Sequence, residues 1–189
     1  MPMEIFVCPK DWTFARSRFT PDHMVSLLNP GTDTEEVESL RPSWILPEYH
    51  HVSFFYDADI LDPGFQKGMA PTFEEIKTVV DWLTPRCTPE SEARFLIHCE
   101  AGLGRSPAVG YIAWAIHLGV GREEEAFEKM KESCHETKLV PNTVVVTHAD
   151  EILQRRGAMM KPLSAWNRRV TWRRNFGSRL SPGPKNSRG

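Results

Sequence analysis

The stretch that decides the fold is His98-Cys99-Glu100-Ala101-Gly102-Leu103-Gly104-Arg105-Ser106, in which a cysteine and an arginine enclose two glycines. The apolar segment before it, 93–97, is typical of a buried strand. The apolar segment after it, 107–116, has proline in its first turn and predicts a helix. A glycine-rich loop between a strand and a helix N-terminus binds anions, because its unpaired amides and the positive end of the helix dipole point into the loop.

The residue types in this loop predict covalent phosphoryl chemistry. A loop that holds a phosphate also stabilises a thiolate, so Cys99 is expected to be ionised near neutral pH and nucleophilic. Arg105 supplies a planar fork that binds two phosphate oxygens. Ser106 is expected to donate its hydroxyl to the cysteine sulfur, although a serine at a helix start is also an ordinary cap. The backbone amides expected to bind the remaining oxygens belong to Glu100, Ala101, Gly102, Leu103, Gly104 and Arg105.

The sequence Cys-x5-Arg-Ser, after a histidine at the end of a strand, resembles the signature of the cysteine-based protein tyrosine and dual-specificity phosphatases. It is most similar to a small, single-domain bacterial branch of that family. Further matches are Arg41-Pro42, the Asp59-Ile60-Leu61-Asp62-Pro63 segment, Pro71 and Pro141-Asn142. The resemblance covers residues 3 to 156 or thereabouts, which is most of what one domain needs.

The resemblance implies a general acid that protonates the leaving oxygen, on a loop after a strand and some tens of residues before the cysteine. The candidates are Asp57, Asp59 and Asp62. Asp59 best matches the Asp-Ile-x-acid-Pro pattern of the branch, whereas Asp57 lies at a strand end, where related enzymes place their acid. We prefer Asp59, keep Asp57 as the alternative, and interpret Asp62 as a turn residue before a proline.

The rest of the chain alternates between strand and helix patterns. Strands are predicted at 4–8 and 51–56, and the segment 21–28 fits a short helix leading into a strand. A loop is expected at 57–70, and helices are predicted at 71–83, 122–133 and 141–153. This alternation indicates an α/β fold, a three-layer sandwich with a mainly parallel central sheet flanked by helices and the catalytic loop at the carboxyl end of a strand.

The composition is that of one globular domain, with 189 residues of which 40% are apolar and 25% charged. No run is as long as a membrane span, and the start of the chain lacks the basic and apolar regions of a secretory signal. We therefore expect a cytoplasmic protein, with no metal and no cofactor. The four cysteines fit a reduced compartment. A disulfide between Cys99 and either Cys87 or Cys134 would protect the nucleophile from over-oxidation, but free buried thiols are favoured.

Charge is distributed unevenly along the chain. Residues 1–151 hold 13 basic and 25 acidic residues, whereas residues 152–189 hold ten basic residues and no acidic one. We expect a catalytic domain at 1–157 and a basic, disordered C-terminal tail at 158–189. The tail interleaves arginine pairs with aromatic residues, a composition that also suits an acidic partner, nucleic acid or an anionic membrane surface.

These features favour a phosphatase that acts on phosphotyrosine in proteins through a phosphocysteine. Phosphoserine and phosphothreonine are further substrates if the site is shallow, and no phosphotyrosine-clamping loop is recognisable in the sequence. The basic tail suggests an alternative, a polynucleotide 5′-phosphatase or a phosphoinositide phosphatase of the same fold. A catalytically silent phosphate-binding adaptor is the remaining alternative, against which the intact Cys99, Arg105 and candidate acids argue.

Overall fold

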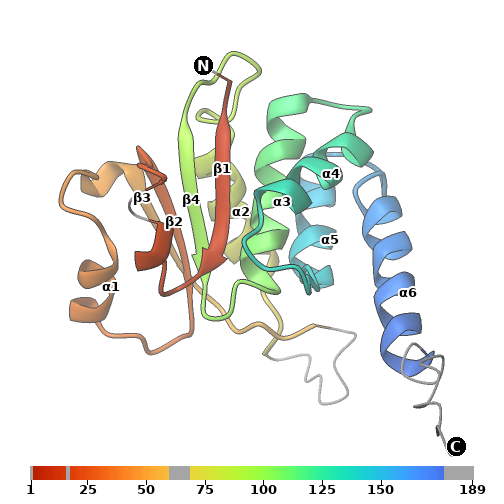
Figure 1. The fold of residues 1–189 in the computed structure, drawn as a ribbon. Helices are drawn as coiled ribbons and strands as arrows, with labels where there is room; N and C mark the ends of the chain where they lie inside the picture. Colours follow the sequence, from red (N-terminus) through yellow and green to blue (C-terminus); the bar gives the residue numbers. More distant parts are fainter. Residues whose placement is uncertain (1, 16–17, 60–68, 177–189) are drawn as a thin grey trace, which may run out of the picture.

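The structure is a computed structural model that describes residues 2–15, 18–59 and 69–176, with the side chains of the last helix described as far as Arg168. Strands and helices alternate along these residues (Figure 1). The strands are β1 (Glu4–Pro9), β2 (His23–Leu28), β3 (His50–Phe54) and β4 (Arg94–Cys99). The α-helices are α1 (Thr34–Leu40), α2 (Phe73–Leu83), α3 (Arg105–Leu118), α4 (Glu123–Ser133), α5 (Thr143–Ile152) and α6 (Met160–Phe176), and two 3-10 turns lie at Thr13–Ala15 and Pro47–Tyr49.

The sheet places β4 between two other strands. Its order is β1-β4-β2-β3, and all the pairings are parallel. Pro9 of β1 is in register with Cys99, and Ser26 of β2 is in register with His98. Because the carboxyl ends of parallel strands meet at one edge of a sheet, the loop after Cys99 begins between the ends of β1 and β2.

The main hydrophobic core lies between the sheet and the helices drawn on the right of Figure 1. Alternate residues of the strands point into it, as the two-residue period of a strand requires. Helix α3 is buried from Arg105 through Ala115, so it is the central helix of this layer. The residues that β1 and β4 contribute to this core include Ile5, Val7, Phe95, Ile97 and Cys99.

The opposite face of the sheet carries a smaller core of Cys8, Trp12, Met24, Ile45 and Leu96. Two of these residues, Trp12 and Ile45, come from connections between elements. Helix α1 lies on this side (Figure 1), and none of its residues is buried. The expected α/β fold with a parallel sheet flanked by helices is confirmed, but its two outer layers are unequal.

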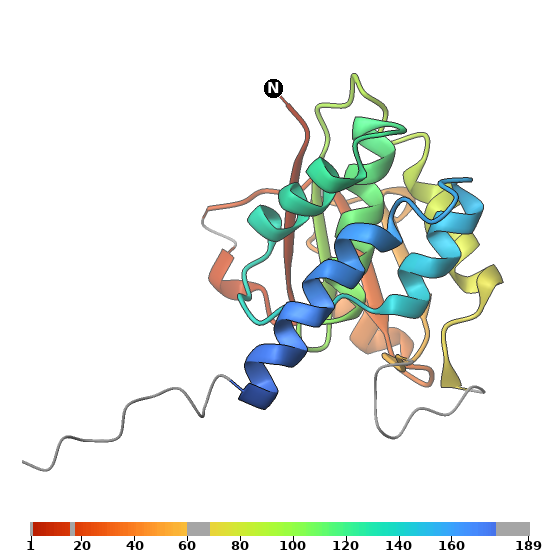
Figure 2. The ribbon, with the colours of Figure 1, turned by 90° about the vertical axis from the view of Figure 1, so that its right-hand side faces the viewer.

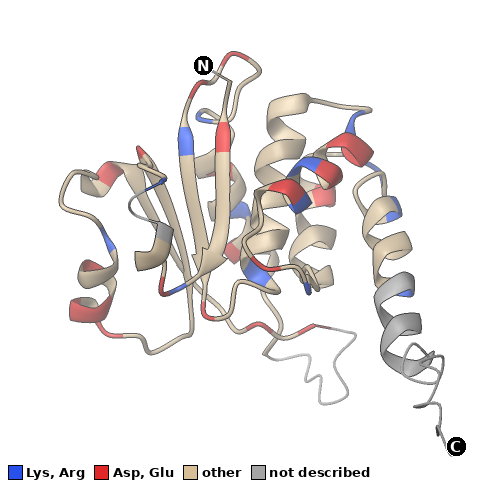
Figure 3. Cartoon of the chain, in the orientation of Figure 1, with Lys and Arg blue, Asp and Glu red and all other residues tan. Residues whose placement is uncertain are grey.

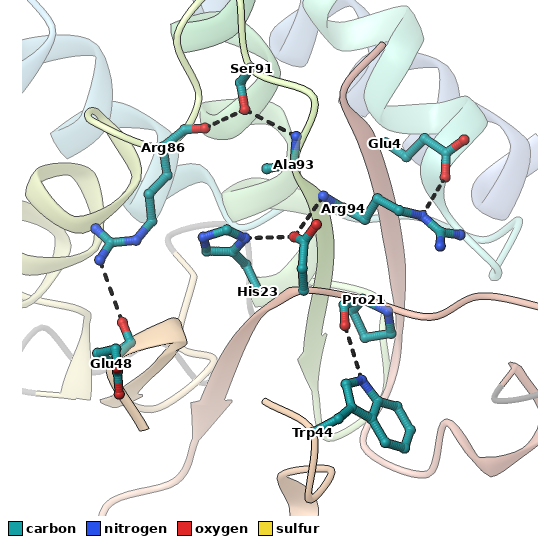
Figure 4. Close-up of polar contacts among 10 residues, drawn as sticks. Glu4, Pro21, His23, Trp44, Glu48, Arg86, Ser91, Ala93 and Arg94 are labelled. Atoms are coloured by element: carbon teal, nitrogen blue, oxygen red, sulfur yellow. Dashed lines mark hydrogen bonds and ion pairs between the residues drawn. The ribbon is translucent and has the colours of Figure 1, made fainter. Parts of the chain in front are cut away.

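A polar network joins the amino ends of three strands, at the edge of the sheet opposite the loop that follows Cys99 (Figure 4). Asp22 accepts a hydrogen bond from the Arg94 backbone at 2.8 Å, and its carboxylate lies 2.6 Å from Nδ1 of His23. Arg94 in turn donates to Glu4 at 2.9 Å. A strand over His23–Leu28 follows directly after Asp22. The short helix that the sequence suggested from residue 21 therefore does not form.

Capping and charge favour α1, which buries none of its residues, and charge also favours the start of α4. Asp33 caps α1 by accepting from the amide of Glu36 at 2.7 Å, and acidic residues occupy the first turns of both α1 and α4. Negative charge near a helix N-terminus is favoured by the helix dipole. Figure 3 shows the acidic positions of α1 at the left margin of the molecule and those of α4 between α3 and α6. Among the described residues, no helix combines the length and the apolar character needed to cross a bilayer.

The C-terminal segment corrects the expectation of a disordered tail from residue 158. Residues 160–176 form helix α6, which lies against α4 and α5 (Figure 2). Met159 and Leu163 are fully buried in the main core, and the indole of Trp166 donates to the carbonyl of Leu139 at 3.0 Å. These apolar side chains draw the segment onto the body, because their burial outweighs the polar character of the residues between them. The folded unit therefore includes α6, and residues 177–189 lie outside the described part.

Candidate active site

The candidate nucleophile, Cys99, is the last residue of β4 and is fully buried. Its Sγ atom lies 3.1 Å from Oγ of Ser106, in the first turn of α3. All four cysteines are free thiols. Burial and the neighbouring Cys99 raise the pKa of Cys134 to about 12, and burial also raises the pKa values of Cys8 and Cys87. These three cysteines are therefore protonated at neutral pH and are poor nucleophiles.

The candidate catalytic loop, residues 100–105, accepts hydrogen bonds from neighbouring segments on several of its carbonyl groups. Leu103 O accepts from the amide of Val140 at 2.9 Å, and Gly104 O accepts from the amide of Asn142 at 3.2 Å. By contrast, the amides of residues 101–104 donate to no described residue, and α3 has no side-chain cap at its N-terminus. Unpaired amides at a helix start form an anion site.

The path of this loop depends on glycine at position 102. Gly102 has φ +72°, and an added Cβ there would lie 2.7 Å from the backbone nitrogen of Pro9. Any side chain would therefore be strained by the backbone conformation and would also collide with the end of β1. The close packing of the loop on β1 is what fixes the position of its amides.

Arg105 is buried and only partly satisfied by the protein. Its Nη1 donates to the carbonyl of Phe55 at 2.7 Å, which fixes the plane of the guanidinium. Its Nε has no hydrogen-bond partner among the described residues, and the closest carboxylate oxygen, Oδ2 of Asp57, is 3.9 Å away. A buried, charged N–H without a partner is costly, so this group is suited to an anion held beside the loop amides.

The carboxyl group of Asp57 lies directly against the candidate catalytic loop, at Gly104. Its side chain is 38% exposed, and its Oδ1 accepts from Nδ2 of Asn142 at 3.0 Å. A Cβ built on Gly104 would lie 2.6 Å from the same Oδ1. The carboxyl group thus occupies the space that a side chain at position 104 would fill, and it remains open to solvent.

Asp59 has a different environment, although it is only two residues away. It is 6% exposed, and its Oδ2 accepts from the backbone amide of Thr143 in the first turn of α5. The structure therefore brings Asp57 into contact with the loop that contains Arg105, whereas the hydrogen bond described for Asp59 is made with α5. The third aspartate considered, Asp62, lies outside the described residues.

His98, the residue before the candidate nucleophile, belongs to a hydrogen-bonded network with a serine and a second histidine. Nε2 of His98 is 2.6 Å from Oγ of Ser26, which is also 2.8 Å from Nε2 of His50. Burial lowers the pKa of His98 to about 3 and that of His50 to about 4. Both imidazoles are therefore neutral at physiological pH, and Ser26 ties β2 and β3 to the residue before Cys99.

Lys10 contacts the first residue of the loop, and the sequence patterns do not predict this contact. Its backbone amide donates to Glu100 O at 3.3 Å, and its ammonium group contacts the carboxylates of Glu100 at 2.8 Å and Glu36 at 2.6 Å. These two hydrogen bonds raise the pKa of Lys10. The lysine thereby joins the first residue of the loop to the end of β1 and to α1.

Three aromatic residues that could line the rim of a phosphate site, Trp12, Phe14 and Trp44, lie in different environments. Trp12 is buried in the smaller core, and Trp44 lies at the opposite end of the sheet (Figure 4). Phe14 is exposed and packs on His135, with ring centroids 4.3 Å apart, whereas Phe65 lies outside the described residues. In the described ranges, no three His, Cys, Asp or Glu side chains meet as a potential metal site.

The comparisons with known proteins identify the fold. No family model matches the sequence, and no curated protein sequence is significantly similar to it. Among solved structures, the chain resembles the PTP-2 phosphatase of Cydia pomonella, with 18% identity, 80% of this chain and 84% of that chain covered, and a TM-score of 0.51. It also resembles human DUSP28, with 13% identity, 82% and 94% covered, and a TM-score of 0.52. The chain has the fold of the protein tyrosine and dual-specificity phosphatases.

Proposed function

We propose that the protein is a phosphoric monoester hydrolase that forms a phosphocysteine on Cys99. The observation that carries the proposal is the unsatisfied donor set around the loop. A buried Arg105 Nε and the amides of residues 101–104 have no protein acceptor among the described residues. Such donors fit the oxygens of a phosphoryl group, and Cys99 lies at the base of the same loop.

In the first step, the Cys99 thiolate attacks phosphorus while the bond from phosphorus to the leaving oxygen breaks. Arg105 and the loop amides bind the non-bridging oxygens, whose charge they stabilise in the transition state. Asp57 donates its proton to the leaving oxygen, so the product departs as a neutral alcohol or phenol. The phosphoryl group is left on sulfur.

In the second step, a water molecule attacks phosphorus and gives its proton to the carboxylate of Asp57. The sulfur–phosphorus bond breaks, inorganic phosphate forms, and the Cys99 thiolate departs as the leaving group. The hydroxyl of Ser106, 3.1 Å from Sγ, donates a hydrogen bond to that thiolate. The acid and the nucleophile are thereby restored to their starting protonation states.

The geometry supports Asp57, rather than the sequence-preferred Asp59, as the acid. A general acid must approach the leaving group, which extends from the catalytic loop toward solvent. The exposed carboxyl of Asp57 touches the loop at Gly104, whereas Asp59 is buried and accepts a hydrogen bond from α5. We therefore assign proton transfer to Asp57.

The proposed substrate is phosphotyrosine in proteins, with phosphoserine and phosphothreonine also accepted. The proposal for dual specificity rests on the sequence, in which no phosphotyrosine-clamping loop is recognisable. A reducing compartment such as the cytoplasm suits the mechanism, because it keeps Cys99 as a thiol. Phosphopeptides, a phosphoinositide and a 5′-phosphorylated RNA, compared by kcat/KM, test the substrate class. A preference for the lipid or the RNA would overturn it.

The test of the activity itself is hydrolysis of p-nitrophenyl phosphate in the presence of EDTA. Cys99→Ser should abolish turnover but retain binding of vanadate, because Arg105 and the loop amides remain. Cys87→Ser is the matched control, since Cys87 is also a fully buried thiol but lies after α2. Turnover by Cys99→Ser at the wild-type rate would rule out the covalent mechanism.

A further inference from the structure

Asn142 is the residue before α5, and its backbone amide and both polar atoms of its side chain form hydrogen bonds around the site. It is 1% exposed. Its backbone amide donates to Gly104 O at 3.2 Å, and its Oδ1 accepts from the Val145 amide at 3.1 Å. Its Nδ2 donates both to Oδ1 of Asp57 at 3.0 Å and to the carbonyl of Ala58 at 3.1 Å. The residue thus contacts the loop through its backbone amide, and the acid segment and α5 through its side chain.

The next residue along the chain makes a second connection between the same elements. The backbone amide of Thr143 donates to Oδ2 of Asp59. Residues 57–59 are therefore fastened to the start of α5 at both ends, with the donors on α5 and the acceptors on the acid segment. A short segment held at both ends has little freedom to move its carboxyl groups.

We propose that Asn142 is a positioning residue for the general acid. Asp59, which accepts from the Thr143 amide, holds the other end of the same segment in place. The inference rests on the proposed function of Asp57. Because Oδ1 of Asp57 already accepts a hydrogen from Asn142, a proton on this carboxyl group resides on Oδ2. Oδ2 is the oxygen 3.9 Å from Nε of Arg105. Asn142 thus directs the acidic proton toward the side on which the phosphoryl group is bound.

A capping role alone does not account for these contacts. A helix N-cap needs one side-chain acceptor, and in Asn142 that acceptor is Oδ1. The two hydrogens of Nδ2 serve the acid segment instead. Serine and aspartate are also good caps, but neither can donate as an amide does. Substitution by these residues therefore separates the two roles.

The first test is Asn142→Asp, which keeps the cap, removes both donations and places a negative charge beside Asp57. We expect kcat/KM for phenyl phosphate to fall by about 10- to 100-fold, part of the contribution of a general acid. Hydrolysis of an activated aryl phosphate should fall much less, because its leaving group needs no proton. The alkaline limb of the kcat/KM profile should move to higher pH, since a like charge favours the protonated carboxyl.

Asn142→Ser is the second variant, because it removes the donations without adding charge. It should show the same dependence on the leaving group, and this variant decides the question if Asn142→Asp does not fold. The control is Thr72→Asp, which exchanges the N-cap of α2, a helix whose cap is formed with Glu75 and not with the site. The control should leave both substrates and the pH profile unchanged.

The outcomes separate this inference from the proposed function. If Asp57→Asn shows the leaving-group dependence but neither variant at position 142 does, the positioning role is wrong and the acid assignment stands. If variants at position 142 slow both substrates equally with an unchanged pH profile, Asn142 is only a cap, and the inference is overturned. If Asp57→Asn itself has no such dependence, the acid assignment fails.

Discussion

The Sγ atom of Cys99 lies 3.1 Å from the Oγ atom of Ser106, and the pair joins the end of β4 to the first turn of α3. A hydroxyl that donates to a thiolate stabilises it both as nucleophile and as leaving group. In the proposed mechanism the second role matters more, because the thiolate departs from phosphorus without help from a proton.

Ser106→Ala should therefore slow breakdown of the phosphocysteine more than its formation. We expect kcat to fall by about 10- to 100-fold, the equivalent of one hydrogen bond to a charged group. A rapid burst of p-nitrophenol, close in amount to the enzyme, should precede the slow phase. Stopped-flow absorbance measures both phases, and an unchanged kcat without a burst would contradict the role.

Asp57→Asn should slow hydrolysis of phenyl phosphate far more than that of an activated aryl phosphate, and should remove the fall of kcat/KM at high pH. Asp59→Asn should retain both signatures, because an amide oxygen can still accept from Thr143. Initial rates across a pH series measure the two effects. The opposite result would return the acid to Asp59 and leave the covalent mechanism intact.

Gly104→Ala should affect the acid and spare the phosphate site. The new Cβ would lie 2.6 Å from Oδ1 and 2.8 Å from Cγ of Asp57, so the carboxyl group must move. Activity on phenyl phosphate should fall while affinity for vanadate is kept. Gly102→Ala should lose both, because it collides with the Pro9 backbone at a positive φ. Vanadate inhibition constants of the two variants provide the comparison.

Two partly buried histidines should make the folded state sensitive to mild acid. Burial lowers the pKa values of His50 and His51 from the ordinary value of 6.5 to about 4. The unfolded chain takes up these protons first, so stability is full above pH 6.5 and is lost as pH falls from 6.5 towards 4. Each histidine contributes about 1.4 kcal/mol per pH unit at most in that window.

Urea denaturation at pH 7.5 and pH 5.0 measures this loss. His51→Gln, which keeps a partner for the Ser53 hydroxyl, should lose less stability between the two pH values than the wild type. Equal stability of the wild type at both pH values would show that these imidazoles are not held neutral in the fold.

Helix α6 should contribute to the stability of the folded unit. Leu163→Ala removes a fully buried side chain and should cost about 2–5 kcal/mol of unfolding free energy. Lys161→Ala, on the exposed side of the same helix, should change it by about 0.5 kcal/mol or less. Denaturation midpoints with unchanged m-values would report the difference, and equal effects would mean that α6 is not docked in solution.

The sequence predicts the strands and helices around the 100–105 loop well, and it predicts the peripheral helices α1 and α6 poorly. Strands β1 and β4 and helices α2 to α5 carry clear apolar patterns, because each buries one face or the whole element. Helix α1 has no buried residue, so it leaves no pattern. Helix α6 presents Leu163 and Trp166 between basic residues, and its composition therefore resembled that of a solvated tail.

The proposed general acid shows why sequence motifs alone do not locate a site. Asp57 and Asp59 are two residues apart, and either fits a loop after a strand. What separates them is Asn142 with its neighbour Thr143, about 85 residues later in the chain. Contacts of that sequence separation depend on tertiary packing, and no local pattern reports them.

The register of β1 against β4 also determines when the site can form. Glu4 pairs with Arg94, and Lys10 contacts Glu100, so each contact closes a loop of 90 residues. Closing so long a loop costs chain entropy that is recovered only once the surrounding sheet is in place. The loop amides of residues 101–104 are therefore expected to reach their final positions late in folding. Until then Cys99 lacks the neighbouring loop amides and the Ser106 hydroxyl, so the proposed reactivity is coupled to the completion of the native state.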